Sequence, residues 1–260
     1  MQRRTFLQTT LATGGIAAMP MLTAADDTKS KRAYFEIRAY SLKPEKQKVL
    51  DDYLKGALLP GLNRGGIEKV GVFSETPAPA VPVTYLLIPY QSLDQMSSVN
   101  SALESDQDYL KSAAEYFAAP ATDPVYDRIE SSLLHAFETM PSLEAPEKKK
   151  SRLFNLRVYE SHNEAAGKKK IEMFNKGEIS IFRRVGLTPV LFGEAVVGTR
   201  IPNLTYLLVF DDDTARNEAW NRFRTDPEWV KLKAIPEYED KRIVSKITNK
   251  LLTPADYSQI

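Results

Sequence analysis

Tyr34-Phe35-Glu36-Ile37-Arg38-Ala39-Tyr40 returns 119 residues later as Leu153-Phe154-Asn155-Leu156-Arg157-Val158-Tyr159. Both stretches alternate their side chains with a period of two, which is typical of a β-strand. Further matches keep the same order at offsets of 119 to 121 residues: Phe73-Ser74-Glu75 with Phe192-Gly193-Glu194, and 84–88 with 205–209. Chance similarity would not preserve order and spacing in this way, so the chain contains two copies of one unit.

Each copy is expected to run strand, helix, strand, strand, helix, strand. In the first copy, apolar residues at helical spacing follow the opening strand over 44–58, and Gly65-Gly66 ends that helix. This order is typical of a ferredoxin-like α+β unit, an antiparallel sheet with its helices on one face. We assign the repeats to residues 34–135 and 153–252, joined by an exposed linker over 136–152 that contains prolines and a lysine run.

The central strands predict how the two sheets meet. Residues 85–88 and 206–210 are apolar at consecutive positions, which indicates burial on both faces. Helices can cover one face of each sheet and the sheet of the other repeat can cover the second face. We therefore expect the two antiparallel sheets to pack into an α+β barrel. Pairing of each unit with another chain is the alternative, which leaves a homodimer possible.

The composition excludes several classes of protein. The chain has 260 residues, with 35 Lys and Arg against 34 Asp and Glu, so it lacks the surplus of positive charge that nucleic-acid binding requires. It has no Cys, which excludes disulfide scaffolds, thiolate zinc sites, iron–sulfur clusters and Cys nucleophiles. Two His leave little room for an imidazole-rich metal site. We expect no metal and no cofactor.

Residues 1–25 have the pattern of a cleavable export signal. Arg3-Arg4 precede Phe6-Leu7 and an uncharged stretch that ends in small residues before Asp26. The paired arginines resemble the twin-arginine (Tat) export signal, with Gln2 and Gln8 at its outer positions. The stretch is too polar and too interrupted for stable residence in hydrocarbon. We therefore expect an exported, periplasmic protein without a stable membrane anchor after cleavage.

The repeats resemble a known family. Their Phe-Glu-Ile-Arg-Ala-Tyr and Phe-Asn-Leu-Arg-Val-Tyr openings, the turns into Val-Gly-Val-Phe-Ser-Glu and Val-Leu-Phe-Gly-Glu, and the Tyr-Leu-Leu strands are similar to the NIPSNAP family. The resemblance covers both repeats and implies the dimeric α+β barrel fold. Asn155 departs from the Glu-x-Arg-x-Tyr opening that is typical of the family. Exported tandem members are bacterial and mostly uncharacterised, so function must be argued at the site.

Two arginines are the leading candidates for a ligand site. Arg38 and Arg157 occupy equivalent positions on the opening strands, and we expect both to point into the barrel, away from the helices. A buried guanidinium needs a partner or an anion. One interpretation is a clamp for a ligand carboxylate or phosphate, completed by the hydroxyls of Tyr40 and Tyr159. The favoured alternative is an internal salt bridge to one of three carboxylates: Glu36, Glu75 or Glu194.

Candidates for catalysis are few. Glu75 or Glu194 could act as a general base if burial raised its pKa, although a solvated or turn-bonded Glu is commoner at a strand end. His135 and His162 are expected at the surface, because neither has a second ligand at metal-binding spacing. The catalytic residues therefore stay unknown. We interpret the late aromatics Trp220, Phe223 and Trp229 as packing residues, and Asp211-Asp212-Asp213 as a turn with helix-capping acids.

Two functions remain open. The first is an exported barrel of unassigned activity that binds a small anionic or aromatic molecule between its sheets. The second is a cofactor-free or haem-dependent monooxygenase that resembles the antibiotic-biosynthesis type, acting on an aromatic or quinol substrate. The polar face and the many tyrosines favour the second function, whereas the scarcity of His speaks against it.

Overall fold

The computed structural model describes residues 31–148 and 151–260, and the predicted export signal at 1–25 lies outside them. The described part contains eight strands: β1 (Tyr34–Ser41), β2 (Gly71–Glu75), β3 (Val83–Tyr90), β4 (Arg128–Ala136), β5 (Leu153–Glu160), β6 (Thr188–Val197), β7 (Asn203–Phe210) and β8 (Lys246–Pro254). Its α-helices are α1 (Gln47–Tyr53), α2 (Leu59–Arg64), α3 (Leu93–Ser105), α4 (Gln107–Ser112), α5 (Ala114–Phe117), α6 (Glu164–Met173), α7 (Ile179–Val185), α8 (Asp213–Thr225), α9 (Pro227–Lys233) and α10 (Asp240–Ile243). Four single-turn segments complete them: η1 (Pro44–Lys46) and η4 (Pro236–Tyr238) are 3₁₀ helices, and η2 (Leu54–Leu58) and η3 (Phe174–Glu178) are π-helical.

The strands close into one antiparallel barrel in the order β1-β3-β2-β8-β5-β7-β6-β4. Within each repeat the opening strand lies between the third and fourth strands. Two further pairings, β2 with β8 and β4 with β6, join the repeats, so each barrel strand has a neighbour on both edges. The predicted α+β fold of two β-α-β-β-α-β repeats that form a barrel is confirmed, and a single chain supplies the whole barrel.

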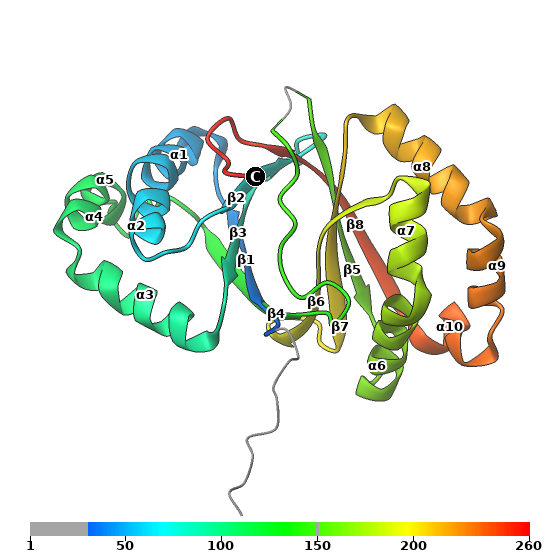
Figure 1. Cartoon of the computed structure of the whole chain (residues 1–260). Helices are drawn as coiled ribbons and strands as arrows, with labels where there is room; N and C mark the ends of the chain where they lie inside the picture. The colour runs from blue at the N-terminus through cyan, green and yellow to red at the C-terminus, as the bar shows by residue number, and fades with distance from the viewer. Residues whose placement is uncertain (1–30, 149–150) are drawn as a thin grey trace, which may run out of the picture. The chain divides into compact units, whose positions relative to one another are not determined.

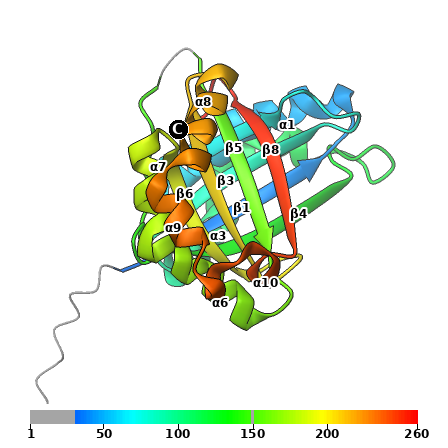
Figure 2. The ribbon, with the colours of Figure 1, turned by 90° about the vertical axis from the view of Figure 1, so that its right-hand side faces the viewer.

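Helices lie outside the barrel, those of the first repeat on one side and those of the second on the other (Figure 1). Figure 2 turns the second repeat toward the viewer, with α7 and α9 to the left of β5 and β8 in this view. The predicted capping by the acidic run is confirmed, because Asp212 accepts a hydrogen bond of 2.8 Å from the Ala215 amide where α8 begins. Gly186 ends α7 with a φ of +88°, a conformation that favours glycine. Among the described residues, none of the helices combines the length and hydropathy of a membrane span.

Three groups of buried apolar side chains form the core. Two lie between the sheet of each repeat and its own helices. The third fills the inside of the barrel and combines both repeats, with Phe73 and Phe154 at a ring-centroid distance of 4.8 Å. Phe137 and Met140, in the segment between the repeats, are buried in the core of the second repeat. This part of the connection is therefore anchored against the second sheet.

The alternation of β1 faces the opposite way from the prediction. Phe35 belongs to the core inside the barrel, whereas Tyr40 belongs to the core under the helices. Arg38 lies opposite Leu86, which also packs under the helices, and directly paired residues point to the same face of a sheet. Arg157 lies likewise opposite a residue of the second helix-facing core. The prediction that both arginines point into the barrel is wrong, because both faces of these strands are buried and alternation alone does not identify the helix side.

The strand register also corrects the alignment of the repeats. Leu86 lies opposite Arg38, and Tyr206 lies opposite Arg157. Tyr206 therefore corresponds to Leu86 and not, as the sequence match indicated, to Tyr85. Because side chains alternate, this shift of one residue places the two tyrosines on opposite faces of their sheets.

Candidate functional site

In the first repeat, an ion pair with a buried carboxylate satisfies the partly buried Arg38. Its Nε and Nη2 donate to the two carboxylate oxygens of Glu36 at 2.5 and 3.0 Å. Glu36 is 4% exposed and also accepts from the Ser131 hydroxyl at 2.8 Å and the Tyr90 hydroxyl at 3.0 Å. Burial favours a raised pKa for Glu36, but the bonds from Arg38, Ser131 and Tyr90 outweigh it and hold the pKa below its usual value. The predicted internal salt bridge is confirmed for Arg38, and Tyr40 is packed against the Tyr126 ring.

The second repeat lacks these partners. The strand register gives the equivalent positions: Asn155 for Glu36, Asn249 for Ser131 and Phe210 for Tyr90. None of the three replacements carries a carboxylate. Among the described residues, no carboxylate lies within ion-pair distance of Arg157, and the predicted salt bridge to Glu75 or Glu194 is wrong.

Arg157 is held by aromatic side chains instead. Its Nη2 donates to the Tyr159 hydroxyl at 3.2 Å, and its guanidinium lies over the Trp220 ring at 4.6 Å from the centroid. The Tyr159 hydroxyl also accepts from the Tyr206 hydroxyl at 3.0 Å. The Nε of Arg157 is buried and has no hydrogen-bond partner. The predicted association of Arg157 with Tyr159 is therefore observed, on the helix-covered face of the sheet.

Arg157 lines a surface cavity of about 380 Å³ beside α8 and α9. Three aromatic side chains line it, Trp220, Phe223 and Trp229, so these residues do more than the packing that the sequence predicted. Four cationic side chains line it against one carboxylate, Asp240. The cavity therefore combines flat apolar surfaces with an excess of positive charge, which suits a small anion with an aromatic part.

A second buried ion pair lies next to this cavity. Lys170 is 1% exposed and Glu178 is 2% exposed, and their charged atoms are 3.0 Å apart. The Lys170 ammonium is also 3.7 Å from Asp240 of the cavity and 5.7 Å from the centroids of Tyr159 and Trp229. Burial favours a raised pKa for Glu178, and the charge of Lys170 opposes that effect.

The first repeat carries no charge at these two positions. The π-helical turns η2 and η3 correspond, so that Leu50 and Leu58 occupy the places of Lys170 and Glu178. π-Helical turns of this kind are frequent at functional sites. Sequence reasoning missed the ion pair. A usable signal was present, because Lys170 and Glu178 occupy helix positions that are apolar in the other repeat.

The two strand-end glutamates lie apart. Glu75 points into the barrel, where it accepts from the Tyr85 hydroxyl at 2.6 Å and pairs with Lys250 of the second repeat. Glu194 faces the helices and pairs with Lys168 at 2.6 Å. Both carboxylates are thus neutralised in separate places, and their predicted assembly with the arginines is wrong.

A cavity does lie between the two sheets, where the sequence predicted the ligand. It has a volume of about 210 Å³ and polar lining residues from both repeats, among them Tyr85, Lys250 and Arg200. Neither Arg38 nor Arg157 lines it. The predicted arginine clamp therefore does not lie in the cavity between the sheets, where the sequence placed the ligand.

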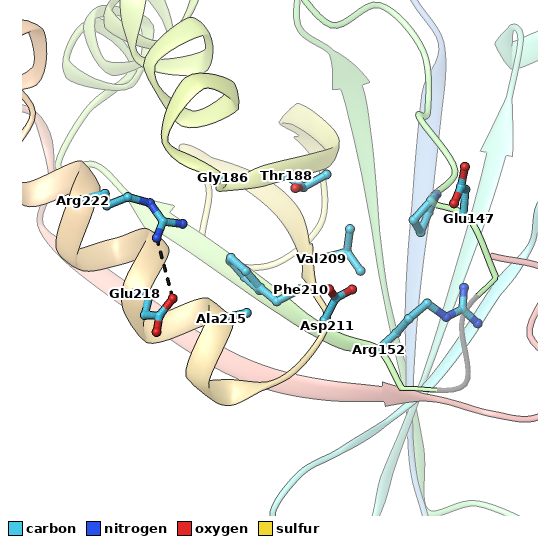
Figure 3. Close-up of a pocket in the computed structure, with 11 residues that line it drawn as sticks. Glu147, Arg152, Gly186, Thr188, Val209, Phe210, Asp211, Ala215, Glu218 and Arg222 are labelled. Carbon is cyan, nitrogen blue, oxygen red and sulfur yellow. Dashed lines mark ion pairs between the residues drawn. The ribbon is translucent and has the colours of Figure 1, made fainter.

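Figure 3 shows another cavity, of about 370 Å³, beside the segment that joins the repeats. Arg222 lines it and is paired with Glu218 at 3.8 Å, and Arg152 and Glu147 lie on its other side. Carboxylates and cations are similar in number here. This cavity lacks the excess of positive charge that surrounds Arg157.

The histidines do not contribute to the Arg157 cavity. His135 stacks on Tyr34 with ring centroids 4.6 Å apart, and His162 is exposed after β5. Within residues 31–148 and 151–260, no cluster of three His, Cys, Asp or Glu side chains could hold a metal ion. The residues around Arg157 offer no imidazole to a haem iron, so the haem-dependent alternative does not fit this cavity.

The comparisons with known proteins identify both repeats. A model of the NIPSNAP family matches residues 35–141 and 154–259. Two structures provisionally assigned as monooxygenases are similar. The one from Fusobacterium nucleatum has a TM-score of 0.59 and 10% identity, and the match covers 86% of this chain and 92% of that chain. The one from Lactobacillus acidophilus has a TM-score of 0.58 and 12% identity, and the match covers 86% of this chain and 94% of that chain. An anthrone oxidase-like protein is also similar (0.50, 10%, 87% and 92%). At these identities the likeness concerns the fold alone. None of the curated proteins compared with the chain matches it.

Proposed function

The chain belongs to the NIPSNAP family, and we propose that its second repeat binds a small aromatic molecule with an anionic group in the Arg157 cavity. The observation that carries this proposal is the partly buried Arg157, which has no carboxylate within ion-pair distance among the described residues and whose Nε is buried without a partner. Arg157 and Lys170 supply two positive charges, the buried Glu178 supplies one negative charge, and the exposed Asp240, 3.7 Å from Lys170, supplies another. An anionic ligand would pair with Arg157, which has no carboxylate within ion-pair distance among the described residues, because a desolvated charge without a partner is costly.

The aromatic part of the ligand is inferred from the cavity walls. Trp220 already covers one face of the Arg157 guanidinium, and Phe223 and Trp229 line the same cavity. Aromatic side chains contribute large contact areas and favour stacked or edge-to-face arrangements with a ligand ring. The cavity of about 380 Å³ is of the size that small-molecule sites have in proteins.

Titration calorimetry with 2-naphthoate tests this proposal. The wild-type chain is expected to bind, and Arg157→Gln is expected to weaken binding at least about 10-fold, since a hydrogen-bonded charge contributes roughly 1.5–3 kcal/mol. Arg38→Gln is the matched control, because it removes the equivalent arginine of the other repeat. Equal binding by wild type and Arg157→Gln would contradict the proposal.

A cofactor-free oxygenase is the second candidate. The Tyr159 hydroxyl receives hydrogen bonds from Arg157 and Tyr206, so a cation and phenols lie together beside the cavity. Such a group could stabilise the anion that an activated aromatic CH₂ forms when it loses a proton. Oxidation of that CH₂ to C=O by O₂ places one oxygen atom in the product and the other in water, and the substrate supplies the four electrons. Anthrone is a suitable probe, and its oxygen uptake should fall to the uncatalysed rate in Arg157→Gln; no uptake above that rate in wild type would exclude this candidate.

Export is also proposed, from the paired arginines at positions 3 and 4. Replacing both residues with Lys should retain the full-length chain in the cytoplasm of a bacterial host. Cell fractionation checks this expectation, and a periplasmic protein despite both substitutions would contradict it.

A further inference from the structure

We propose that the anionic group of the ligand is a carboxylate, and that Asn155 is the residue that leaves Arg157 free to bind it. This inference rests on the proposed function and names the ligand class for the same cavity. It comes from the internal comparison of the two repeats, because the first repeat already holds a carboxylate on the equivalent arginine.

The geometry of that internal pair defines what the arginine recognises. Arg38 uses Nε and Nη2 together, each donating to one oxygen of the Glu36 carboxylate. Such a planar, two-point contact fits a carboxylate and fixes its orientation. On Arg157 the same two nitrogens meet no carboxylate, since Nη2 donates to the Tyr159 hydroxyl and Nε has no hydrogen-bond partner.

Asn155 explains why the second repeat lacks an internal carboxylate. It occupies the position of Glu36 and is fully buried. Its amide nitrogen donates to the Asn249 side-chain oxygen at 2.5 Å and to the Lys250 carbonyl at 3.1 Å, on the neighbouring strand β8. The side chain is neutral, shorter than Glu and engaged with β8. Position 155 therefore determines whether the arginine is neutralised from within or by a ligand.

An internal carboxylate at position 155 should compete with the ligand for Arg157. Asn155→Glu places a carboxylate on the same strand, two residues from Arg157, as Glu36 is placed for Arg38. An intramolecular group acts at a high effective concentration, so this variant should bind 2-naphthoate about 100-fold more weakly than wild type. Asn155→Gln is the matched control, because it adds the same length without charge, and its binding should stay within about threefold of wild type.

The experiment is a calorimetric comparison of three probes on the full chain: 2-naphthoate, the neutral 2-naphthamide and 2-naphthyl phosphate. On wild type we expect the carboxylate to bind at least about 10-fold more tightly than the amide, and more tightly than the phosphate. We also expect the affinity for 2-naphthoate to fall in Asn155→Glu but not in Asn155→Gln. The probe comparison uses the wild-type chain only, so it stays decisive if a substitution at the buried position 155 prevents folding.

The contradicting results separate this inference from the proposed function. Equal binding of 2-naphthoate and 2-naphthamide would overturn the carboxylate while the aromatic binding site stands. Tighter binding of the phosphate, or unchanged binding in a folded Asn155→Glu variant, would also overturn it. Binding of none of the three probes would refute the proposed function and this inference with it.

Discussion

The two repeats build the same sheet and the same helical layer, yet they treat an equivalent arginine in opposite ways. Arg38 is neutralised by a carboxylate two residues away on its own strand, whereas Arg157 meets a tyrosine hydroxyl and a tryptophan ring. In the helices, the internal ion pair is in the second repeat instead: Lys170 and Glu178 form a buried pair where the first repeat has two leucines. The two repeats thus share one fold, while a few differences in sequence change which charged groups under the helices are paired.

This difference indicates a division of roles. In the first repeat, tyrosines pack closely under the helices, with Tyr53 and Tyr116 stacked at a ring-centroid distance of 3.8 Å. Its ion pair has the partners it needs and requires no ligand. In the second repeat the charged groups border a cavity. We infer that the first repeat serves mainly to complete the barrel and that the second repeat carries the ligand site.

The largest expected effect is on stability, and it differs between the arginines. Arg38→Gln leaves the Glu36 carboxylate buried without its cation, which should lower the free energy of unfolding by about 3–5 kcal/mol. Arg157→Gln removes a partly buried charge that has no carboxylate within ion-pair distance among the described residues, so its effect should be about 1 kcal/mol or less. Urea unfolding of both variants checks the difference. Equal losses would show that the two arginines are equally neutralised.

The Lys170–Glu178 pair offers the next largest effect. Lys170→Met strands a buried carboxylate and should lower the free energy of unfolding by about 3 kcal/mol. The double change Lys170→Leu with Glu178→Leu copies the first repeat and should restore wild-type stability or exceed it. Thermal unfolding measures both variants. A double variant as unstable as the single one would contradict the expectation that two leucines can replace the pair, as they do in the first repeat.

Glu36 should make the stability of the protein depend on acid pH. Its pKa in the folded state is lowered from a value of 4.5, so its contribution is complete above that pH and is lost as the pH falls through the lowered pKa. Glu36→Gln should therefore show a smaller loss of stability between about pH 5 and pH 3. Asn155→Asp at the equivalent position serves as a contrast. An unchanged pH profile in Glu36→Gln would contradict the assignment.

Trp220 should have the smallest effect on binding. Trp220→Phe keeps an aromatic ring near Arg157 but weakens the cation–π contact, so the affinity for 2-naphthoate should fall about threefold. Calorimetry detects a change of this size, with the solvent-exposed substitution Phe117→Leu in the first repeat as the control. A change above about 30-fold would mean that the tryptophan, and not the arginine, dominates binding.

The sequence predicted the fold because the repeat, the order of elements and the doubly apolar central strands agree with one another. It did not predict which face of β1 meets the helices, since Phe35 and Tyr40 are both apolar enough to be buried. It also aligned Tyr85 with Tyr206, although the strand register separates them. Arg157 and Tyr159 were identified correctly as neighbours, whereas Lys170 and Glu178 become visible only when the helices of the two repeats are compared.

The most direct test observes both arginines in one experiment. The Nε–H signals of Arg38 and Arg157 can be assigned in a ¹H–¹⁵N correlation spectrum by use of the two Arg→Gln variants, and 2-naphthoate can then be added. We predict that the Arg157 signal shifts as the ligand carboxylate binds its Nε, while the Arg38 signal, already bound to Glu36, stays in place. An Arg157 signal that does not move while the ligand binds, or an Arg38 signal that moves as far, would contradict the account.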